Sequence, residues 1–223
     1  MTRNLARPDP SVANLPRHRA IVALDIEQST SRPDPVKAEL RRTIYDLFDQ
    51  ALHSAGIGRY HRDPFNDRGD GLLALIRPDQ VPKALLLSRA IPALNTLLAS
   101  YNEALPADDR PHRQLRIRAV VHAGEIHYDA NGCFGEALDI AFRLLDAPGV
   151  KKTLRTAPGP LTLVISADIY RTVVRHGYAG IDQHAFHPLV RVHIAGTRHT
   201  GWIYLPEATK IFVTEITSYK QSA

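Results

Sequence analysis

Two short apolar runs, each with an acidic residue at one edge, limit the folds open to this chain. Asp25 directly follows the run 20–24, and Asp70 comes shortly before the run 72–76. Runs of this length and composition predict buried strands. If they pair as neighbours, two carboxylates converge at one end of a sheet, which is an arrangement that holds Mg²⁺. Taken separately, each segment is better explained by a helix cap or a plain turn.

Composition favours a single large domain. The chain has 223 residues, of which 44% are hydrophobic, enough for a substantial core. No run reaches the ~20 apolar residues of a membrane helix, and the N-terminus has no apolar signal core. Cys133 is the single cysteine, so an internal disulfide and a cysteine metal cluster are excluded. We therefore expect a cytoplasmic protein with no membrane partner.

The net charge of +5 and the pI near 9.5 raise the question of nucleic acid. The basic residues are scattered, and no aromatic-basic alternation or DNA-reading motif is present. We therefore expect no nucleic-acid partner, although a nucleic-acid-binding protein stays open as the weakest hypothesis. A steep salt dependence of oligonucleotide binding would be its signature.

Periodicity and turn residues divide the chain into a flexible tail (1–18), one domain (19–206) and a C-terminal extension (207–223). We expect strands at 20–24, 60–66, 72–76, 115–121, 124–128, 161–165, 189–194 and 201–205, with 124–128 returning as a hairpin arm. We expect helices from Asp34 to about Gly56, at 78–101 with an interruption near Pro92, at 135–145, and after a Ser166 cap. This order predicts an α+β fold.

A third segment makes the pattern more specific. His122-Ala-Gly-Glu-Ile-His-Tyr-Asp is followed by a helix that carries Asp139 and Arg143. In their order, the three segments resemble the class III nucleotidyl cyclases, the catalytic domains of adenylate and guanylate cyclases, over roughly residues 19–206. The residues of these three segments are similar to those of stand-alone actinobacterial relatives and, distantly, to those of the pyrimidine cyclases of Pycsar antiphage systems. The resemblance implies a ferredoxin-like fold with a central, mostly antiparallel sheet and flanking helices.

The resemblance also implies a metal site and a reaction. A cyclase converts a nucleoside triphosphate to a 3′,5′-cyclic nucleotide and pyrophosphate with two Mg²⁺ or Mn²⁺ ions per site. By resemblance, the metal ligands are Asp25, Asp70 and the carbonyl of Ile26. Phosphates would be cradled by the backbone amides of Glu27, Gln28, Ser29 and Thr30. This loop is altered, because the family has a Gly and a Phe among these positions.

Three positions expected to contact ribose and phosphate need separate treatment. Asp139 and Arg143 lie four apart, so spacing alone favours a plain ion pair on one helix face. The family has Asn at position 139 and uses the Arg to stabilise charge on the α-phosphate. Asp139 departs from that pattern, and its charge works against phosphate. The family's late lysine is missing, and Arg198 is the nearest substitute, although a solvated hairpin turn explains it equally well.

The positions that select the base carry Asn66 and Gly132 in this chain. Neither the adenine-reading pair nor the guanine-reading pair of the family is present. Tyr60, Asn66 and Asn131 could surround a pyrimidine, which would make UTP or CTP the substrate. Ordinary loop residues are the alternative explanation for these positions.

Both halves of the family's site occur in one chain, so the resemblance implies a homodimer with composite active sites. A catalytically impaired, cyclase-fold nucleotide-binding or regulatory module is the alternative. Asp139, the missing lysine and the missing base pair favour that alternative. The intact Asp25, Asp70 and Arg143 oppose it.

Overall fold

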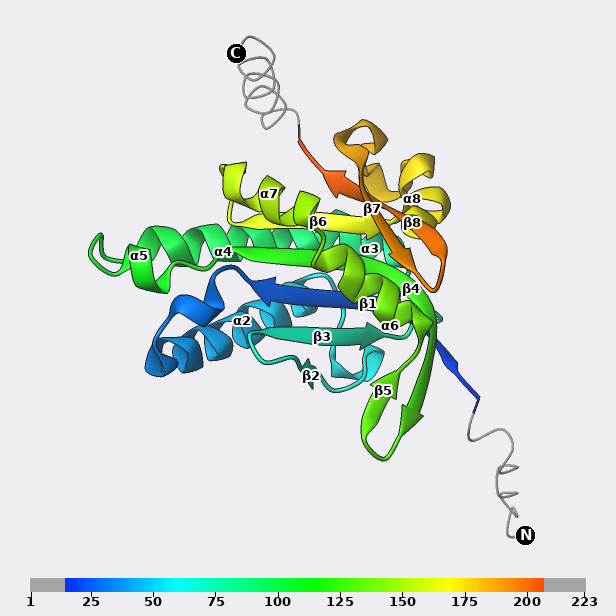
Figure 1. Cartoon of the computed structure of the whole chain (residues 1–223), viewed down its shortest axis with the longest axis horizontal. Helices are drawn as coiled ribbons and strands as arrows, with labels where there is room; N and C mark the ends of the chain where they lie inside the picture. Colours follow the sequence, from blue (N-terminus) through cyan, green and yellow to red (C-terminus); the bar gives the residue numbers. More distant parts are fainter. Residues whose placement is uncertain (1–14, 207–223) are drawn as a thin grey trace.

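The apolar runs of the sequence form the central strands of one sheet in the computed structural model, which describes residues 15–206 (Figure 1). The strands are β1 (Arg17–Ile26), β2 (Asn66–Asp67), β3 (Gly71–Ile76), β4 (Ile117–Asp129), β5 (Gly132–Phe134), β6 (Leu161–Ser166), β7 (Phe186–Ile194) and β8 (Thr197–Tyr204). The sheet has the order β2-β3-β1-β4-β6-β8-β7, and β5 pairs with β4 off this path. Only the β4–β6 pairing is parallel among the described strands. The expected α+β architecture with a mostly antiparallel sheet is therefore confirmed.

Alternating side chains divide the core into two layers. Ala20, Val22 and Leu24 of β1 pack into one cluster, and Ile21 and Ala23 pack into the other, as the two-residue period of a strand requires. The α-helices are α2 (Asp34–Ser54), α3 (Lys83–Leu85), α4 (Ile91–Ala104), α5 (Arg110–Arg113), α6 (Glu136–Leu145), α7 (Pro148–Thr156) and α8 (Ala167–Thr172). Helices α2, α4 and α8 contribute to the first cluster, and α6 and α7 contribute to the second.

Shorter helical turns complete the chain. They comprise a π turn, η3 (Leu86–Ala90), and the 3-10 turns η1 (Ser29–Ser31), η2 (Arg59–His61), η4 (Val174–His176), η5 (Tyr178–Gly180) and η6 (Gln183–Ala185). The Ser166 side chain accepts a hydrogen bond from the amide of Ile169 and caps α8, as predicted. None of the helices in the described part of the chain is long and apolar enough to cross a bilayer.

Several predicted boundaries need correction. The first strand already includes Arg17 and His18, which were expected in the tail, because Arg17 pairs with Ile126. The rest of the predicted tail up to residue 14, and the predicted extension 207–223, lie outside the described residues.

Two predicted strands are wrong in kind. The segment 60–66 is mostly the turn η2 and a loop, with an isolated bridge from Arg62 to Ile76 and strand structure only at Asn66–Asp67. The segment 124–128 is no hairpin arm, because β4 runs unbroken from Ile117 to Asp129 and turns back afterwards into β5. A hairpin arm and a strand continuation share the same local pattern, so only pairing across the sheet distinguishes them.

The helix interruption near Pro92 is confirmed, and it takes the form of the π turn η3 directly before α4. Pro has no N–H to donate to the preceding helical turn, which explains an irregularity at this point. The helix begins at Lys83 and extends to Ala104, later at both ends than predicted.

Gly71 positions the edge of the sheet where the two predicted metal ligands lie. It pairs with Asp25 across β1 and β3, and a Cβ at this position would lie 2.1 Å from the Leu24 carbonyl oxygen. Only glycine allows this approach. The amide of Ile26 then donates to the carbonyl of Asp70 at 3.2 Å, which fixes Asp70 beside the end of β1.

Candidate active site

Two carboxylates lie on neighbouring strands at one end of the sheet. Asp25 is the penultimate residue of β1, and Asp70 directly precedes β3. Both side chains are half-buried, and the charge of Asp70 contributes to raising the pKa of Asp25. The pairing inferred from the two apolar runs is therefore present, and it brings the two acids together.

Arg118 on β4 is the nearest cation to this pair. It lies opposite Asp25 in the β1–β4 register and forms a hydrogen-bonded ion pair with the Asp25 carboxylate. Burial raises the pKa of Asp25, and Arg118 opposes that rise. Sequence analysis missed Arg118, because the contact joins residues far apart in the chain.

The donor set fits a divalent cation. Two carboxylates that repel one another, at a half-buried strand end, are stabilised when a cation lies between them. Among the described residues, no three His, Cys, Asp or Glu side chains group closely enough to hold a metal alone. A metal at Asp25 and Asp70 would therefore need further oxygen ligands, such as the Ile26 carbonyl and phosphate oxygens.

The predicted phosphate loop follows β1. The Glu27 amide is not available, because it donates to the Arg116 carbonyl at 2.8 Å, and the Glu27 carboxylate pairs with Arg116 at 3.0 Å. Ser29 and Thr30 begin the turn η1, where amides have no carbonyl of the same turn to bond. Gln28 has φ 57, the left-handed conformation that glycine adopts most easily. Three of the four predicted amides, those of Gln28, Ser29 and Thr30, therefore stay as candidates for binding phosphate.

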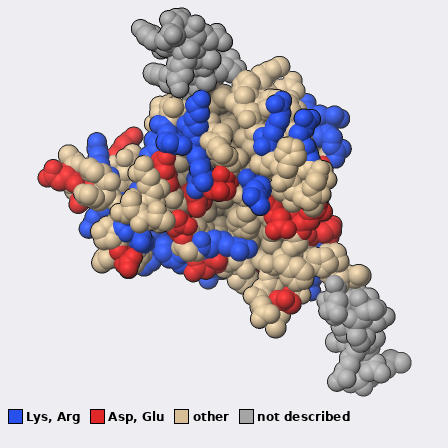
Figure 2. Space-filling model, in the orientation of Figure 1, with Lys and Arg blue, Asp and Glu red and all other residues tan. Residues whose placement is uncertain are grey.

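A basic pocket of about 250 Å³ opens beside this loop. Its lining consists of Glu27, Gln28, Arg118, Lys151 and Arg155. Lys151 and Arg155 are four residues apart on α7, so they share one face. Figure 2 shows Lys and Arg side chains over this part of the molecule, with acidic side chains beside them. Three cations next to the phosphate loop make this pocket suited to a polyanion.

Two acids partly balance these cations, and one of them is Asp25 through its ion pair with Arg118. The carboxylate of Asp146, directly after α6, forms an ion pair with Lys151 at 2.5 Å and another with Arg118 at 3.7 Å. Arg155 has no carboxylate partner among the described residues. The four-residue spacing of Lys151 and Arg155, which places both side chains on one face of a helix, was the signal that could have identified this pocket from the sequence.

Asp139 and Arg143 lie on the solvent-exposed side of α6. No ion pair or hydrogen bond joins their side chains within residues 15–206, although their spacing permits one. The simple explanation from spacing, an i,i+4 ion pair, is therefore not what the structure contains. Both side chains remain available to a ligand or to another copy of the chain.

Within one chain, Arg198 lies far from the predicted metal ligand Asp25. β8 runs antiparallel to β6, and Ser166 pairs with Gly201. The start of β8, with Arg198, is therefore at the opposite end of the sheet from Asp25. Any contact of Arg198 with phosphate at Asp25 would require a second copy of the chain.

The predicted base-selecting residues are only partly brought together. The Asn66 side-chain oxygen accepts a hydrogen bond from the Cys133 thiol at 3.8 Å, so Asn66 lies beside β5, where Gly132 is the first residue. Tyr60 is 89% exposed, and its carbonyl contacts Arg77 beyond the far end of β3. Tyr60 is therefore not next to Asn66, and Cys133 is the neighbour that the sequence analysis left out.

His122 is structural in this chain. It is buried, and its Nδ1 lies 2.8 Å from the Ser166 hydroxyl. Burial lowers the pKa of His122 to about 4, so the ring is neutral near pH 7. It connects β4 to the cap of α8.

No protein-family model and no curated protein matches the sequence. Similar solved structures are cyclase domains. An adenylate/guanylate cyclase/hydrolase from Silicibacter pomeroyi has a TM-score of 0.57 at 17% identity, covering 86% of this chain and 98% of that one. A bacterial light-regulated adenylyl cyclase has a TM-score of 0.55 at 15% identity, covering 93% and 99%. The adenylyl cyclase CyaB from P. aeruginosa has a TM-score of 0.54 at 10% identity, covering 86% and 96%. The chain therefore has the fold of class III adenylate/guanylate cyclase domains.

Proposed function

We propose that this chain is a nucleotidyl cyclase, which converts a nucleoside triphosphate to a 3′,5′-cyclic nucleotide and pyrophosphate. The observation that carries the proposal is the pair of half-buried carboxylates, Asp25 and Asp70, on adjacent strand ends of a cyclase fold, next to a basic pocket. Carboxylates beside a polyanion pocket suit a metal–triphosphate substrate.

In this reaction the ribose 3′-oxygen attacks the α-phosphorus, the bond from that phosphorus to the β-phosphate oxygen breaks, and the hydroxyl proton is released. Asp25, Asp70 and the Ile26 carbonyl would hold Mg²⁺ or Mn²⁺, two per site by resemblance. When bound, these ions lower the pKa of the attacking hydroxyl and neutralise the triphosphate. Amides of Gln28, Ser29 and Thr30 bind phosphate oxygens at the entrance to η1.

The cations of α7 share with Arg198 the role that the resemblance gives to a late lysine. Lys151 and Arg155 line the pocket beside Gln28, and both can pair with the β- and γ-phosphates. Arg118 moves between two anionic partners, the Asp25 carboxylate and a bound phosphate. A planar guanidinium suits phosphate because it donates two parallel hydrogen bonds.

Asp139, Arg143 and Arg198 act from the second protomer of a homodimer. The exposure of Asp139 and Arg143, and the distance of Arg198 from Asp25 within one chain, support this assignment. Arg143 stabilises charge on the α-phosphate, and Asp139 accepts from a ribose hydroxyl.

UTP or CTP is the substrate that we favour. Gly132 has open space where a side chain would project, and the Asn66 amide can donate to or accept from a pyrimidine edge. Asn66→Ala should change the ranking of the four bases. The similarity of these sequence segments to Pycsar cyclases supports a product that acts in antiphage signalling. Phage plating on cells that express the chain or its Asp70→Asn variant tests this role.

The decisive experiment incubates the purified chain with ATP, GTP, CTP and UTP and Mn²⁺, with products identified by mass spectrometry. We expect a 3′,5′-cyclic nucleotide and an equal amount of pyrophosphate. A chain that binds these nucleotides saturably without any cyclic product would instead be the regulatory module, the alternative that Asp139 and the Asp25–Arg118 ion pair favour.

A further inference from the structure

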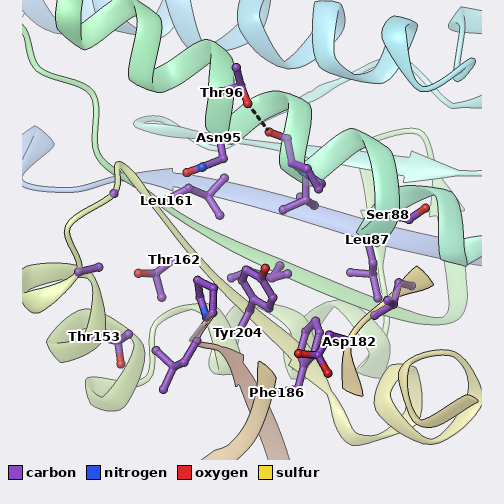
Figure 3. Close-up of a pocket in the computed structure, with 18 of the residues that line it drawn as sticks. Leu87, Ser88, Asn95, Thr96, Thr153, Leu161, Thr162, Asp182, Phe186 and Tyr204 are labelled. Atoms are coloured by element: carbon purple, nitrogen blue, oxygen red, sulfur yellow. Dashed lines mark hydrogen bonds between the residues drawn. The ribbon is translucent and has the colours of Figure 1, made fainter. Parts of the chain in front are cut away.

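A second cavity, of about 590 Å³, lies beside α4 and β6 (Figure 3) and shares no lining residue with the basic pocket. It forms where strands diverge, because β6 pairs with β8 only from Val164 to Ser166. The first half of β6, including Leu161 and Thr162, therefore has β4 as its strand neighbour on one side and the cavity on the other. In Figure 3, Phe186 and Tyr204 project from the ends of β7 and β8 toward α4.

The chemistry of the lining selects a class of ligand. Among the residues that the structure describes, no Lys, Arg or His lines the cavity, and Asp182 is the one carboxylate there. A nucleotide or another anion would therefore find no counter-charge. Apolar side chains dominate, and the volume lies in the range of small-molecule sites, roughly 300–1,000 Å³.

Two buried hydroxyls in this lining have no hydrogen-bond partner in the described part of the chain. They are Thr162 Oγ1, on a residue only 2% exposed, and Ser88 Oγ. A buried hydroxyl without a partner costs free energy, so a side-chain rotation that brings either hydroxyl to an acceptor on a ligand would add affinity. Ser88 belongs to the π turn η3, and π turns occur frequently at functional sites.

The cavity is also connected to the phosphate loop. Arg116 Nη2 donates to the Ala157 carbonyl at 3.4 Å, and Nη1 donates to the Gly159 carbonyl at 3.5 Å. Both of these residues line the cavity. The same guanidinium donates through Nε to the Glu27 carboxylate at 3.0 Å. One half-buried cation thus joins the wall of the cavity to the loop that follows β1.

We propose that this cavity binds a neutral, largely apolar small molecule that carries hydrogen-bond acceptors, and that Arg116 transmits its occupancy to the loop at Glu27. Binding itself is independent of the proposed cyclase activity. A ligand in the cavity contacts the 157–159 segment and so favours one of two arrangements of the Arg116 hydrogen bonds. The hydrogen bond from Arg116 to Glu27 changes as a result.

Nile red is a suitable probe, because it is neutral, mostly apolar and carries a carbonyl acceptor. We expect saturable fluorescence enhancement with the full-length chain. Asn95→Trp places a large ring at the exposed mouth of the cavity and should weaken binding at least tenfold. Ser100→Trp is the matched control, since Ser100 is exposed on the same helix outside the lining, and it should bind as the unmodified chain does.

Thr162→Val removes a hydroxyl with little change of shape and should weaken the probe several-fold while the chain stays folded by thermal denaturation. No saturable signal, as would occur if part of the chain itself filled the cavity, would overturn the site. Equal affinity of Asn95→Trp and Ser100→Trp would overturn it as well.

Transmission is tested by hydrogen exchange with the probe bound. Peptides that cover residues 26–31 should change their exchange rate on probe binding in the unmodified chain. Arg116→Lys, which cannot bridge Glu27 and the 157–159 segment as a fork, should abolish that change while Nile red still binds. An unchanged response in Arg116→Lys, or no response in the unmodified chain, would overturn the coupling.

Discussion

Asp25 experiences two opposing influences, since burial raises its pKa and Arg118 lowers it. Metal binding requires the ionised carboxylate, so affinity is lost as the pH falls through the pKa of Asp25. Because that pKa lies above the ordinary value, the loss should occur at a higher pH than for a solvated aspartate. The balance of these two influences sets the acid limit of the site.

Replacing Arg118 therefore has a defined consequence. Arg118→Met removes the opposing cation, raises the pKa of Asp25 further, and should move the midpoint of acid-dependent Mn²⁺ binding to higher pH. Electron paramagnetic resonance of free Mn²⁺ measures this midpoint. Arg155→Met, in the same pocket but without a bond to Asp25, should leave the midpoint in place. Equal midpoints in Arg118→Met and the unmodified chain would contradict the argument.

His122 should limit stability in acid. Its pKa is lowered by burial to about 4 in the fold, against about 6.5 in the unfolded chain. The unfolded state therefore binds the proton first, and stability falls as the pH drops from about 6.5 to about 4, by an amount on the order of 3 kcal/mol. Urea denaturation at several pH values measures this slope.

The matched variant for this measurement is His122→Gln, which cannot titrate but can still hydrogen-bond Ser166. It should lose less stability than the unmodified chain across this pH window. Identical slopes for both proteins would show that other groups cause the acid sensitivity.

Among the secondary-structure elements, α7 distinguishes this site from the one that the cyclase resemblance implies. Lys151→Ala and Arg155→Ala should each raise KM for the metal–triphosphate about tenfold, as expected for loss of a charge-assisted hydrogen bond worth about 1.5 kcal/mol. Lys152→Ala is the control, because Lys152 is exposed on the same helix and does not line the pocket. If all three variants behave alike in steady-state kinetics, α7 does not contact the phosphates.

The strands β1 and β3, which are buried on both faces, were predictable from sequence because each contains an apolar run. Asp25 follows the first run, and Asp70 shortly precedes the second. Gly124 to Tyr128 was mispredicted, since the same alternation suits a returning arm or a longer strand. Arg118 and Cys133 were missed because their partners, Asp25 and Asn66, are distant in sequence. The local hydrophobic pattern of a sequence indicates which side chains are buried and whether the period suits a helix or a strand. Strand register and long-range ion pairs depend on how the strands assemble into the sheet.

At the scale of the whole molecule, composite sites make a quantitative prediction. Asp25→Ala and Arg143→Ala should each be inactive alone. After subunit exchange, one site of every mixed dimer combines an intact Asp25 with an intact Arg143, so an equal mixture should recover about a quarter of full activity. Activity is measured after mixing, and native mass spectrometry confirms the exchange. Mixed dimers without activity would contradict shared sites.

The proposed reaction requires Asp25 and Asp70 to act together on a metal-bound triphosphate. The most direct test of this requirement is the initial rate of cyclic nucleotide formation in Mn²⁺, with a nucleotide that the unmodified chain turns over. Asp25→Asn and Asp70→Asn should each lower this rate at least about 100-fold, because removing one group that stabilises transition-state charge costs roughly 3 kcal/mol.

Asp67→Asn is the matched control in the same turn, since Asp67 is exposed and pairs with Arg41. We expect Asp67→Asn to stay within a few-fold of the unmodified rate, and we expect Asp25→Asn and Asp70→Asn to be folded but nearly inactive. A near-normal rate in Asp70→Asn, or an equal loss in Asp67→Asn, would contradict this expectation.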